Sequence, residues 1–379
     1  MKKITLGLCL LLLLTGCWDQ LPLRDIHLLD IVGLDLDEGN KNVMVDFVVT
    51  RLMKTGQGQG EPISETTELK GASVVEAVGQ GVYHSRGPFL GISTRVYLMS
   101  EKFASHVPTQ KLAFLLHAPY SSINTPVVLV EGSVSHLLKN ISGTKSGFTD
   151  QLNDFVMSLE TNGVMSNVSM MHFILSGNEP FEDTMLPLVV NKDEKLEMSG
   201  ALLFRQGMST NTKLNVEQVR TFMFLLETHG GRNSYTGNLT ESELGREPIT
   251  GSYHGREYAY VVKRADSKII VQSERNRIPI IHINVKLAIN VFDVGQGLLP
   301  LKPDHINRME QSLSRHLEEI SVRTFKILQQ ANCDVLGIHK QLISFHPKLW
   351  RSLDWRKDYP QVSIKPHFNI QILNAEVEK

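Results

Sequence analysis

The sequence predicts an α+β protein of several domains, with a mixed α/β N-terminal domain and a C-terminal antiparallel sheet packed with a long helix. Helical and strand-like patterns alternate up to about residue 195, which is typical of mixed α/β structure. Apolar residues then recur at every second position along 281–291 and 362–372, as in half-buried strands. Between these strands, residues 304–332 carry apolar side chains at helical spacing, which predicts a helix about 42 Å long.

Length and composition bound the number of domains. The chain has 379 residues, 41% hydrophobic and 21% charged, which is an ordinary globular composition too long for a single core. We expect a lipoprotein signal peptide that is removed, a lipid-anchored tether, an N-terminal mixed α/β domain, a middle unit and a C-terminal domain. Their expected ranges are 1–16, 17–30, 31–195, 196–255 and 256–379.

The N-terminus has the layout of an export signal. Lys2 and Lys3 precede an apolar run at 4–14, which ends in Thr15-Gly16 before Cys17. The run is shorter than the roughly 17–25 residues that a membrane-spanning helix needs. Leu-Thr-Gly-Cys instead fits the lipobox of bacterial lipoproteins. We therefore expect Cys17 to carry a diacylglyceryl thioether and an N-acyl chain (palmitate), because two or more acyl chains anchor a protein stably.

The N-terminal domain is predicted to begin with a hairpin. Strands at 31–37 and 43–49 are joined by the turn-rich 38–42, and Ser73 with Glu76 forms a capping box that opens a helix. The glycine-rich 56–60 lacks the Lys-Ser/Thr of a phosphate-binding loop and is interpreted as a plain loop. The further expected elements are strands at 94–100 and 126–131 and helices from Pro108 to about His117 and at 133–140, 149–160 and 167–176.

The second half begins with a strand at 197–205 and a helix capped by Asn215, with Gln218 reaching back, that runs to Glu227. Residues 228–253 are rich in glycine and polar residues and are expected to form a long exposed connection. Pro366 removes one backbone donor, which places the last strand at a sheet edge or a bulge. The remaining expected strands lie at 256–264, 268–273 and 278–294.

Recognisable catalytic chemistry is missing from the sequence. No His-Glu-x-x-His pair offers a zinc site, no Gly-x-Ser-x-Gly elbow offers a serine nucleophile, and Glu318-Glu319 fall on a helix face expected to be solvated. Cys9 would leave with the signal, so Cys333 is the one remaining free thiol, expected to be a small buried residue. We predict no catalytic residue, metal ligand or cofactor, although residues that converge in space would escape a motif search. The histidines are dispersed, among them His84, His106, His117, His136, His172 and His229.

Charge argues against nucleic acid as a partner. Without Lys2 and Lys3 the chain has 37 basic residues against 40 acidic ones, and no basic block stands out along it. No later segment provides 18 uninterrupted apolar residues. We therefore expect the mature protein to lie on a membrane without crossing it.

Taken in order, several motifs resemble the C-subunit lipoproteins of nutrient germinant receptors in endospore-forming bacteria, the GerC-like or Ger(x)C family. They are Thr15-Gly16-Cys17-Trp18-Asp19, Ile31-Val32-Gly33-Leu34-Asp35, Ser199-Gly200-Ala201-Leu202-Leu203-Phe204, Cys333-Asp334-Val335-Leu336-Gly337-Ile338, Pro347-Lys348-Leu349-Trp350, Trp355 and the strand at 362–372. The similarity spans essentially the whole mature chain. Two places depart from the family pattern: Leu21-Pro22-Leu23 replaces an acidic residue in the tether, and Ile338-His339 follows Leu-Gly where many members have Phe-Gly.

The resemblance implies a non-enzymatic protein anchored by lipid to the outer face of the cell membrane, in spores the inner membrane. It further implies two integral-membrane partners, an A-type and a B-type receptor subunit, and a role in spore germination in response to amino acids or sugars. Of the family's functional residues only Cys17 carries over, as the lipidated position. Two alternatives stay open: a solute-binding lipoprotein of a transporter, which usually has two α/β lobes around a cleft, and a cell-wall hydrolase.

Overall fold

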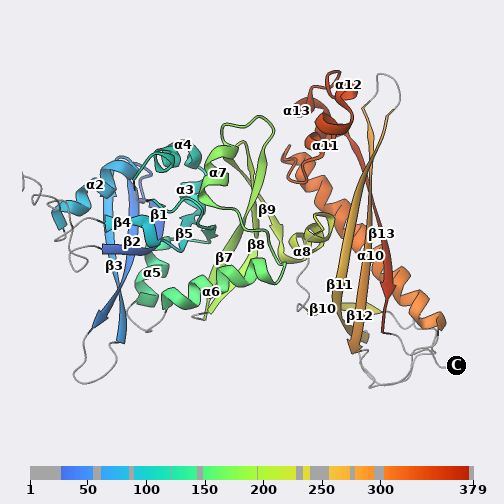
Figure 1. The fold of residues 1–379 in the computed structure, drawn as a ribbon, viewed down its shortest axis with the longest axis horizontal. Helices are drawn as coiled ribbons and strands as arrows, with labels where there is room; N and C mark the ends of the chain where they lie inside the picture. Colours follow the sequence, from blue (N-terminus) through green and yellow to red (C-terminus); the bar gives the residue numbers. More distant parts are fainter. Residues whose placement is uncertain are drawn as a thin grey trace, which may run out of the picture.

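The protein contains two β-sheets that lie side by side, with helices packed on them (Figure 1). The computed structural model describes residues 27–53, 61–84, 89–119, 121–142, 148–193, 195–227, 234–239, 256–273, 278–293 and 303–374. The α+β class predicted from the sequence is confirmed. No helix among the described residues is long and apolar enough to cross a bilayer.

The first sheet has the strand order β3-β2-β1-β5-β6-β7-β8-β9, and the short β4 pairs with β1. Its centre, from β1 through β5 and β6 to β7, is parallel, whereas both flanks are antiparallel. The strands are β1 (His27–Leu36), β2 (Val43–Met53), β3 (Glu61–Gly71), β4 (Phe89–Leu90), β5 (Val96–Ser100), β6 (Val127–Val130), β7 (Asp183–Lys192), β8 (Lys195–Arg205) and β9 (Met208–Asn215).

Helices cover both faces of this sheet. Neighbouring residues of β5 show it: Leu98 belongs to the core cluster with α5 and α6, and Met99 belongs to the cluster with α2, α3, α4 and α7. Every residue of β5 and β6 is therefore buried. The elements are α2 (Val74–His84), η2 (Gly91–Ser93), α3 (Glu101–Ala104), α4 (Pro108–Leu112), η3 (Ala113–Leu116), α5 (Val134–Ser142), α6 (Phe148–Thr161) and α7 (Met170–Ser176).

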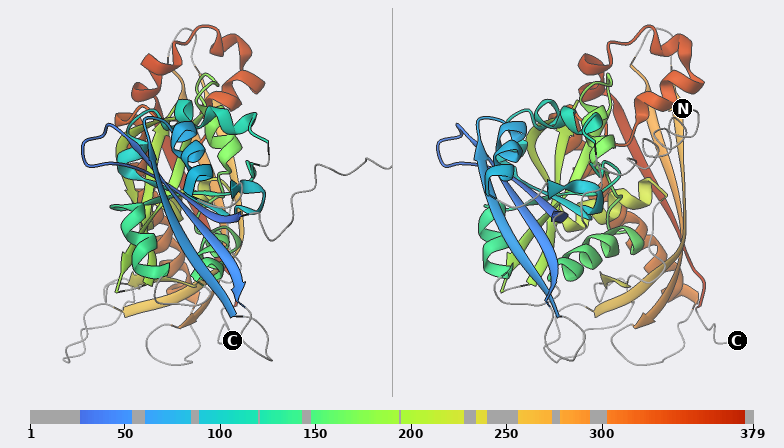
Figure 2. Two further views of the ribbon diagram at one scale, coloured as in Figure 1. Left: turned by 90° about the vertical axis from the view of Figure 1, so that its left-hand side faces the viewer. Right: turned by 60° about the vertical axis from the view of Figure 1, so that its left-hand side comes forward.

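Strands that the sequence analysis assigns to a middle unit extend the first sheet. β8 pairs with β7 as far as Lys195 and Lys192, so the expected boundary at residue 195 falls within a tight hairpin. After β9, the predicted capping box is present: the Gln218 N–H donates to Asn215 Oδ1 (2.8 Å) and the Asn215 N–H donates to Gln218 Oε1 (3.0 Å). It starts α8 (Val216–Leu225), which lies between the two sheets (Figure 2).

The second sheet has the order β10-β11-β12-β13, with the predicted long helix α10 (Pro303–Gln330) packed on one face. The strands are β10 (Ser234–Leu239), β11 (Arg256–Gln272), β12 (Ile280–Asp293) and β13 (Ser363–Ile372). The predicted period of two in β12 is confirmed, because Ile281, Ile283, Val285, Leu287 and Ile289 are all buried.

Two features of the second sheet differ from the expectation. β10 lies inside the stretch 228–253 that we expected to be a bare connection, because Tyr235 is buried there and stacks on Tyr260 (5.4 Å between ring centroids). The last strand, β13, pairs with β12 in parallel, from Ile281↔Ile364 to Ile289↔Ile372. The reason is that α10 and the short helices after it carry the chain back to the end of the sheet where β12 begins. Those helices are α11 (Ile338–Phe345), α12 (Pro347–Trp350), α13 (Trp355–Asp358) and η4 (Tyr359–Gln361).

β13 is an edge strand, as Pro366 predicts, and α10 covers its outer edge. The Phe368 N–H donates to Glu318 Oε1 (2.9 Å), and the Ile372 N–H donates to Glu310 Oε1 (2.8 Å). Glu318, expected to be solvated, thus satisfies a backbone donor on the outer edge. Covering an edge in this way prevents another strand from pairing with it.

Candidate functional site

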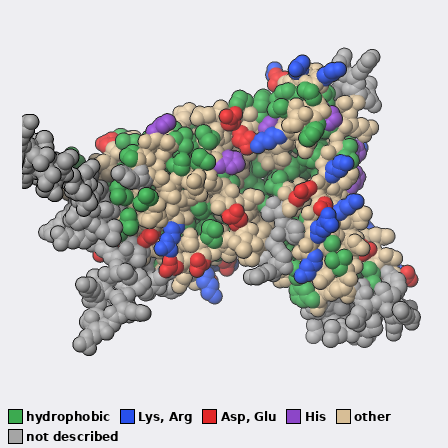
Figure 3. Space-filling view, viewed as in Figure 1, with side chains coloured by type: hydrophobic (Ala, Val, Ile, Leu, Met, Phe, Trp, Pro, Cys, Tyr) green, Lys and Arg blue, Asp and Glu red, His purple; other side chains and the backbone are tan. Residues whose placement is uncertain are grey.

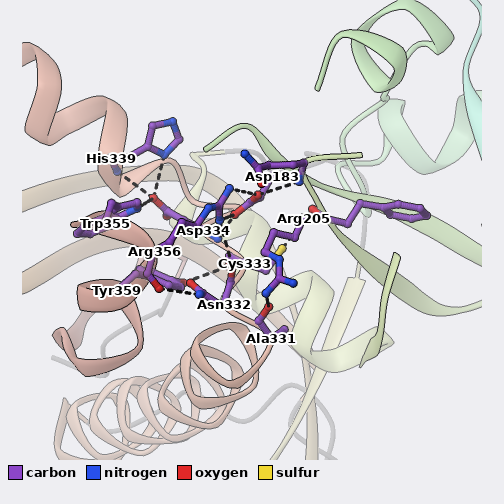
Figure 4. Close-up of polar contacts among 12 residues, drawn as sticks. Asp183, Arg205, Ala331, Asn332, Cys333, Asp334, His339, Trp355, Arg356 and Tyr359 are labelled. Atoms are coloured by element: carbon purple, nitrogen blue, oxygen red, sulfur yellow. Dashed lines mark hydrogen bonds and ion pairs between the residues drawn. The ribbon is translucent and has the colours of Figure 1, made fainter. Parts of the chain in front are cut away.

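A buried polar network joins the two sheets where β7 and β8 meet the segments after α10 (Figure 4). One side provides Asp183 at the start of β7. The other side provides Asn332, Asp334 and Arg356, which lie after α10 and on α13. We call these four residues and their hydrogen-bond partners the clamp.

Asp183 and Arg356 form the central ion pair of the clamp. Arg356 Nη1 and Nη2 lie 2.7 and 2.8 Å from Asp183 Oδ2 and Oδ1, a two-point geometry that fixes direction as well as distance. The Asp183 side chain is 0% exposed and that of Arg356 is 21% exposed. The backbone N–H groups of Asp334 (2.7 Å) and Gln206 (3.2 Å) also donate to Asp183, so its carboxylate is well satisfied despite burial.

Asp334 organises the C-terminal side of the clamp. Its carboxylate accepts from the Ile338 N–H (3.0 Å), the His339 N–H (2.9 Å), His339 Nδ1 (2.9 Å) and Trp355 Nε1 (3.1 Å). Gly337 between them has a φ of +72°, a left-handed conformation that favours glycine. The Asp-Val-Leu-Gly turn thereby brings the N-terminus of α11 onto the carboxylate.

Cys333 and Tyr359 fill the centre of the clamp. The Cys333 thiol donates to the Phe204 carbonyl (3.3 Å), and the Tyr359 hydroxyl donates to the Cys333 carbonyl (3.1 Å). Burial raises the pKa of the Cys333 thiol well above its usual value. The prediction of a small buried cysteine is confirmed, and a thiol this poorly ionised is a weak nucleophile.

Aromatic rings surround the ion pair. The Arg356 guanidinium carbon lies 5.2 Å from the centroid of the Phe181 ring, which in turn meets Trp350 edge-on at 5.4 Å. Trp355 packs against Tyr359 at 5.4 Å. These contacts limit the access of water to the ion pair, which strengthens it.

The clamp has the composition of a catalytic site but not its accessibility. Asp334 orients His339 as an aspartate orients a catalytic histidine. The His339 side chain is only 5% exposed, however, and Cys333 is held in its un-ionised form. No group of three or more metal-ligating side chains occurs among the residues that the structure describes. The clamp can fix the two sheets relative to each other, and we assign it that role.

The predicted lipidation site, Cys17, lies outside the described residues, as do the glycine-rich 56–60 and His229. Those of the noted histidines that the structure describes do not gather: His172 faces Glu182 (3.5 Å) and His106 lies against the Lys102 carbonyl (2.9 Å). The clamp residues were not predicted as a site. Their signal in the sequence was the dense run of motifs from Cys333 to Trp355, which indicated similarity without indicating a role.

Comparisons with known proteins agree along the whole chain. Residues 19–191 match the family described as "Spore germination protein N-terminal domain", and residues 199–376 match "Spore germination B3/ GerAC like, C-terminal". "Spore germination protein GerQC" of Bacillus cereus is 22% identical over 379 residues, covering 100% of this chain and 99% of that protein. "Spore germination protein KC" of Bacillus subtilis (strain 168) is 20% identical over 403 residues, covering 96% and 93%.

A solved structure shares the fold. The structure described as "Crystal Structure of the GerBC protein" matches with a TM-score of 0.59 at 14% identity, covering 90% of this chain and 97% of that one. The architecture of two sheets joined by helices is therefore not peculiar to this sequence.

Proposed function

Because this chain belongs to the Ger(x)C family of spore germination proteins, we propose that it is a non-enzymatic, lipid-anchored subunit of a nutrient germinant receptor. The observation that carries the proposal is the pair of family matches, which follow each other in order from residue 19 to residue 376. The first match begins two residues after Cys17. The lipobox thus stands directly before the region that matches the family, where an anchor belongs.

The proposed absence of enzymatic activity is supported by the state of the most reactive groups. His339 and Asp334 have no open path to a substrate because both are buried in the clamp, and the Cys333 thiol is un-ionised. General acid–base and nucleophilic catalysis both require a group that can reach the reacting atom. The role that remains for a protein of this kind is to bind and position its partners.

The proposed location is the outer face of the cell membrane, in spores the inner membrane, with Cys17 lipidated. There the chain would act with two integral-membrane subunits, an A-type and a B-type, in the response to amino acids or sugars. Confinement to a surface raises the effective concentration of the partners, so modest contacts suffice for assembly.

The anchor is tested by the substitution Cys17→Ala. We expect the protein to move from the membrane fraction to the soluble fraction and nutrient-triggered germination to slow markedly. Cys9→Ala is the matched control, because that cysteine lies in the expected signal peptide and its loss should leave both readouts unchanged. Mass spectrometry of the mature N-terminus should find acylated Cys17. An unmodified N-terminus with residues 1–16 retained would refute the anchor.

The solute-binding alternative requires two lobes that can open around a cleft. Here the two sheets share one hydrophobic core and a buried ion pair, which favours a fixed arrangement. Calorimetry of the protein without its lipid, with amino acids and sugars, separates the two functions. Tight binding in the absence of any partner would favour a solute-binding protein and count against our proposal.

A further inference from the structure

One face of the second sheet carries no helix among the residues that the structure describes. α10 packs on the face that carries the odd-numbered residues of β12, and the even-numbered ones point away from it. Figure 1 shows β11, β12 and β13 in front of α10, with this open face toward the viewer. The twist of the strands hollows the face into a groove of about 1040 Å³ that runs over all three strands.

The groove is basic along its length. Lys263, Arg264, Lys268 and Lys286 line it, against the single acid Asp266. Asp266 already pairs with Arg264 (2.7 Å), and neither Lys268 nor Lys286 forms an ion pair with another described residue. Figure 3 shows Lys and Arg side chains gathered over β11 and β12. Because the whole chain has a net charge of −1, this face concentrates positive charge that the composition does not reveal.

Aliphatic side chains lie among the charged and polar side chains that line the groove. Ile270 on β11 is 41% exposed and Leu373 after β13 is 52% exposed, and Ala288 on β12 pairs with Arg264 on β11. Exposed aliphatic side chains among charged ones are typical of a surface that another molecule covers. The occupant must therefore offer negative charge and apolar side chains together.

The shape of the groove limits which kind of molecule can bind in it. A flat lipid surface would touch the edges of the groove but could not follow its hollow. A small anion would leave the aliphatic side chains exposed. The charged side chains also lack the burial that a small-molecule site provides, since that of Arg264 is 73% exposed. An acidic amphipathic polypeptide segment satisfies both requirements, as a helix does when it lies in a groove.

We propose that this groove docks an acidic amphipathic segment of one of the membrane-embedded receptor subunits. The identity of the partner rests on the proposed function. The chemistry of the segment rests on the groove itself. Lys268 and Lys286 provide the charge recognition, and Ile270, Ala288 and Leu373 provide the apolar contact.

The test reverses the charge of the groove in the full-length, membrane-bound chain. In Lys268→Glu/Lys286→Glu, co-purification with the receptor subunits should fall about tenfold or more, because like charges would then face each other. Lys326→Glu/Lys348→Glu is the matched control, since both lysines are exposed on α10 and α12 outside the groove, and it should retain the subunits. Thermal unfolding of both variants should stay near that of the wild type.

The outcomes separate the two proposals. If the wild type co-purifies with the subunits and the groove variant does so equally well, the docking proposal is wrong and the proposed function stands. If the wild type co-purifies with no receptor subunit, both are wrong.

A cross-linking experiment identifies the molecule that binds in the groove. A photo-cross-linking residue at position 288 should capture a subunit peptide rich in Asp and Glu. Capture of lipid alone, or groove-dependent binding to phosphatidylglycerol vesicles with co-purification intact, would assign the groove to a membrane surface and overturn the proposal.

Discussion

The two sheets differ in how much of their surface is available. The first sheet is covered on both faces, so consecutive residues such as Leu98 and Met99 both serve packing. The second sheet is covered on one face, so in β12 Ile283 serves packing while Asn284 faces outward. The first sheet is therefore a support, and the second can be a support and an interaction surface at once.

The largest expected effect comes from breaking the link between the two sheets. Asp183→Ala leaves the Arg356 guanidinium half-buried without its partner, and loss of one member of a buried pair costs about 3–5 kcal/mol. We expect a corresponding fall in the free energy of unfolding, measured by denaturant titration.

The neighbouring ion pair serves as the control. Lys340 and Glu182 (2.8 Å) also bridge the two sides, but at the surface, so Lys340→Ala should cost no more than about 1 kcal/mol. Equal losses in the two variants would show that the clamp does not hold the sheets together.

Alanine substitutions at consecutive residues of one strand test whether both faces of each sheet are packed. Leu98→Ala and Met99→Ala should each cost about 2–5 kcal/mol, because each opens a cavity on its own face of the first sheet. In β12, Ile283→Ala should cost as much, whereas Asn284→Ala should change the free energy of unfolding by about 0.5 kcal/mol or less. A large loss for Asn284→Ala would mean that the open face is packed in the isolated protein.

The first sheet also contains a buried carboxyl that destabilises it at neutral pH. Burial raises the pKa of Asp46 to about 6, while the hydrogen bond from the Ser135 hydroxyl (2.5 Å) opposes the rise. The folded chain thus holds this proton more tightly than the unfolded chain, whose value is near 3.8. The contribution of Asp46 to stability therefore falls as pH rises from about 4 to about 6.

Asp46→Asn removes this penalty. We expect the variant to be more stable than the wild type by about 2 kcal/mol at pH 7.5, with little difference at pH 4. Asp35→Asn is the control, because the Asp35 carboxylate accepts the N–H groups of Leu36 and Val134 and its loss should destabilise. A stability difference for Asp46→Asn that does not vary with pH would contradict the assignment.

The smallest expected effect is on the open face. Lys268→Gln/Lys286→Gln should change the free energy of unfolding by about 0.5 kcal/mol or less, since neither lysine pairs with another described residue. A larger destabilisation, measured by thermal unfolding, would show that these lysines serve the fold, and the contrast between the sheets would then be weaker than we infer.

Local patterns in the sequence predicted local structure well. The alternation in β12, the apolar stripe of α10, the capping residues Asn215 and Gln218 and the edge position of Pro366 each depend on residues close in the chain, so short-range physics was sufficient. The parallel pairing of β13 depends instead on where the chain returns after α10. The strand β10 depends on the stacking of Tyr235 on Tyr260, which lies on the neighbouring strand β11.

The clamp was beyond prediction for the same reason. Asp183 and Arg356 are 173 residues apart, and nothing near either residue indicates its partner. The sequence showed a dense cluster of motifs around Asp334. It did not show that the Asp334 carboxylate would accept four hydrogen bonds. The basic groove was equally hidden, because Lys286 on β12 joins the basic residues of β11 only through the pairing of the two strands.

The glutamates on α10 have a consequence for crowding. Glu310 and Glu318 occupy outward N–H groups of β13, so a second copy of the protein cannot add its own strand there. Copies crowded together on a membrane would then not pair edge to edge into one continuous β-sheet. Each copy would stay a separate molecule that can exchange with its neighbours.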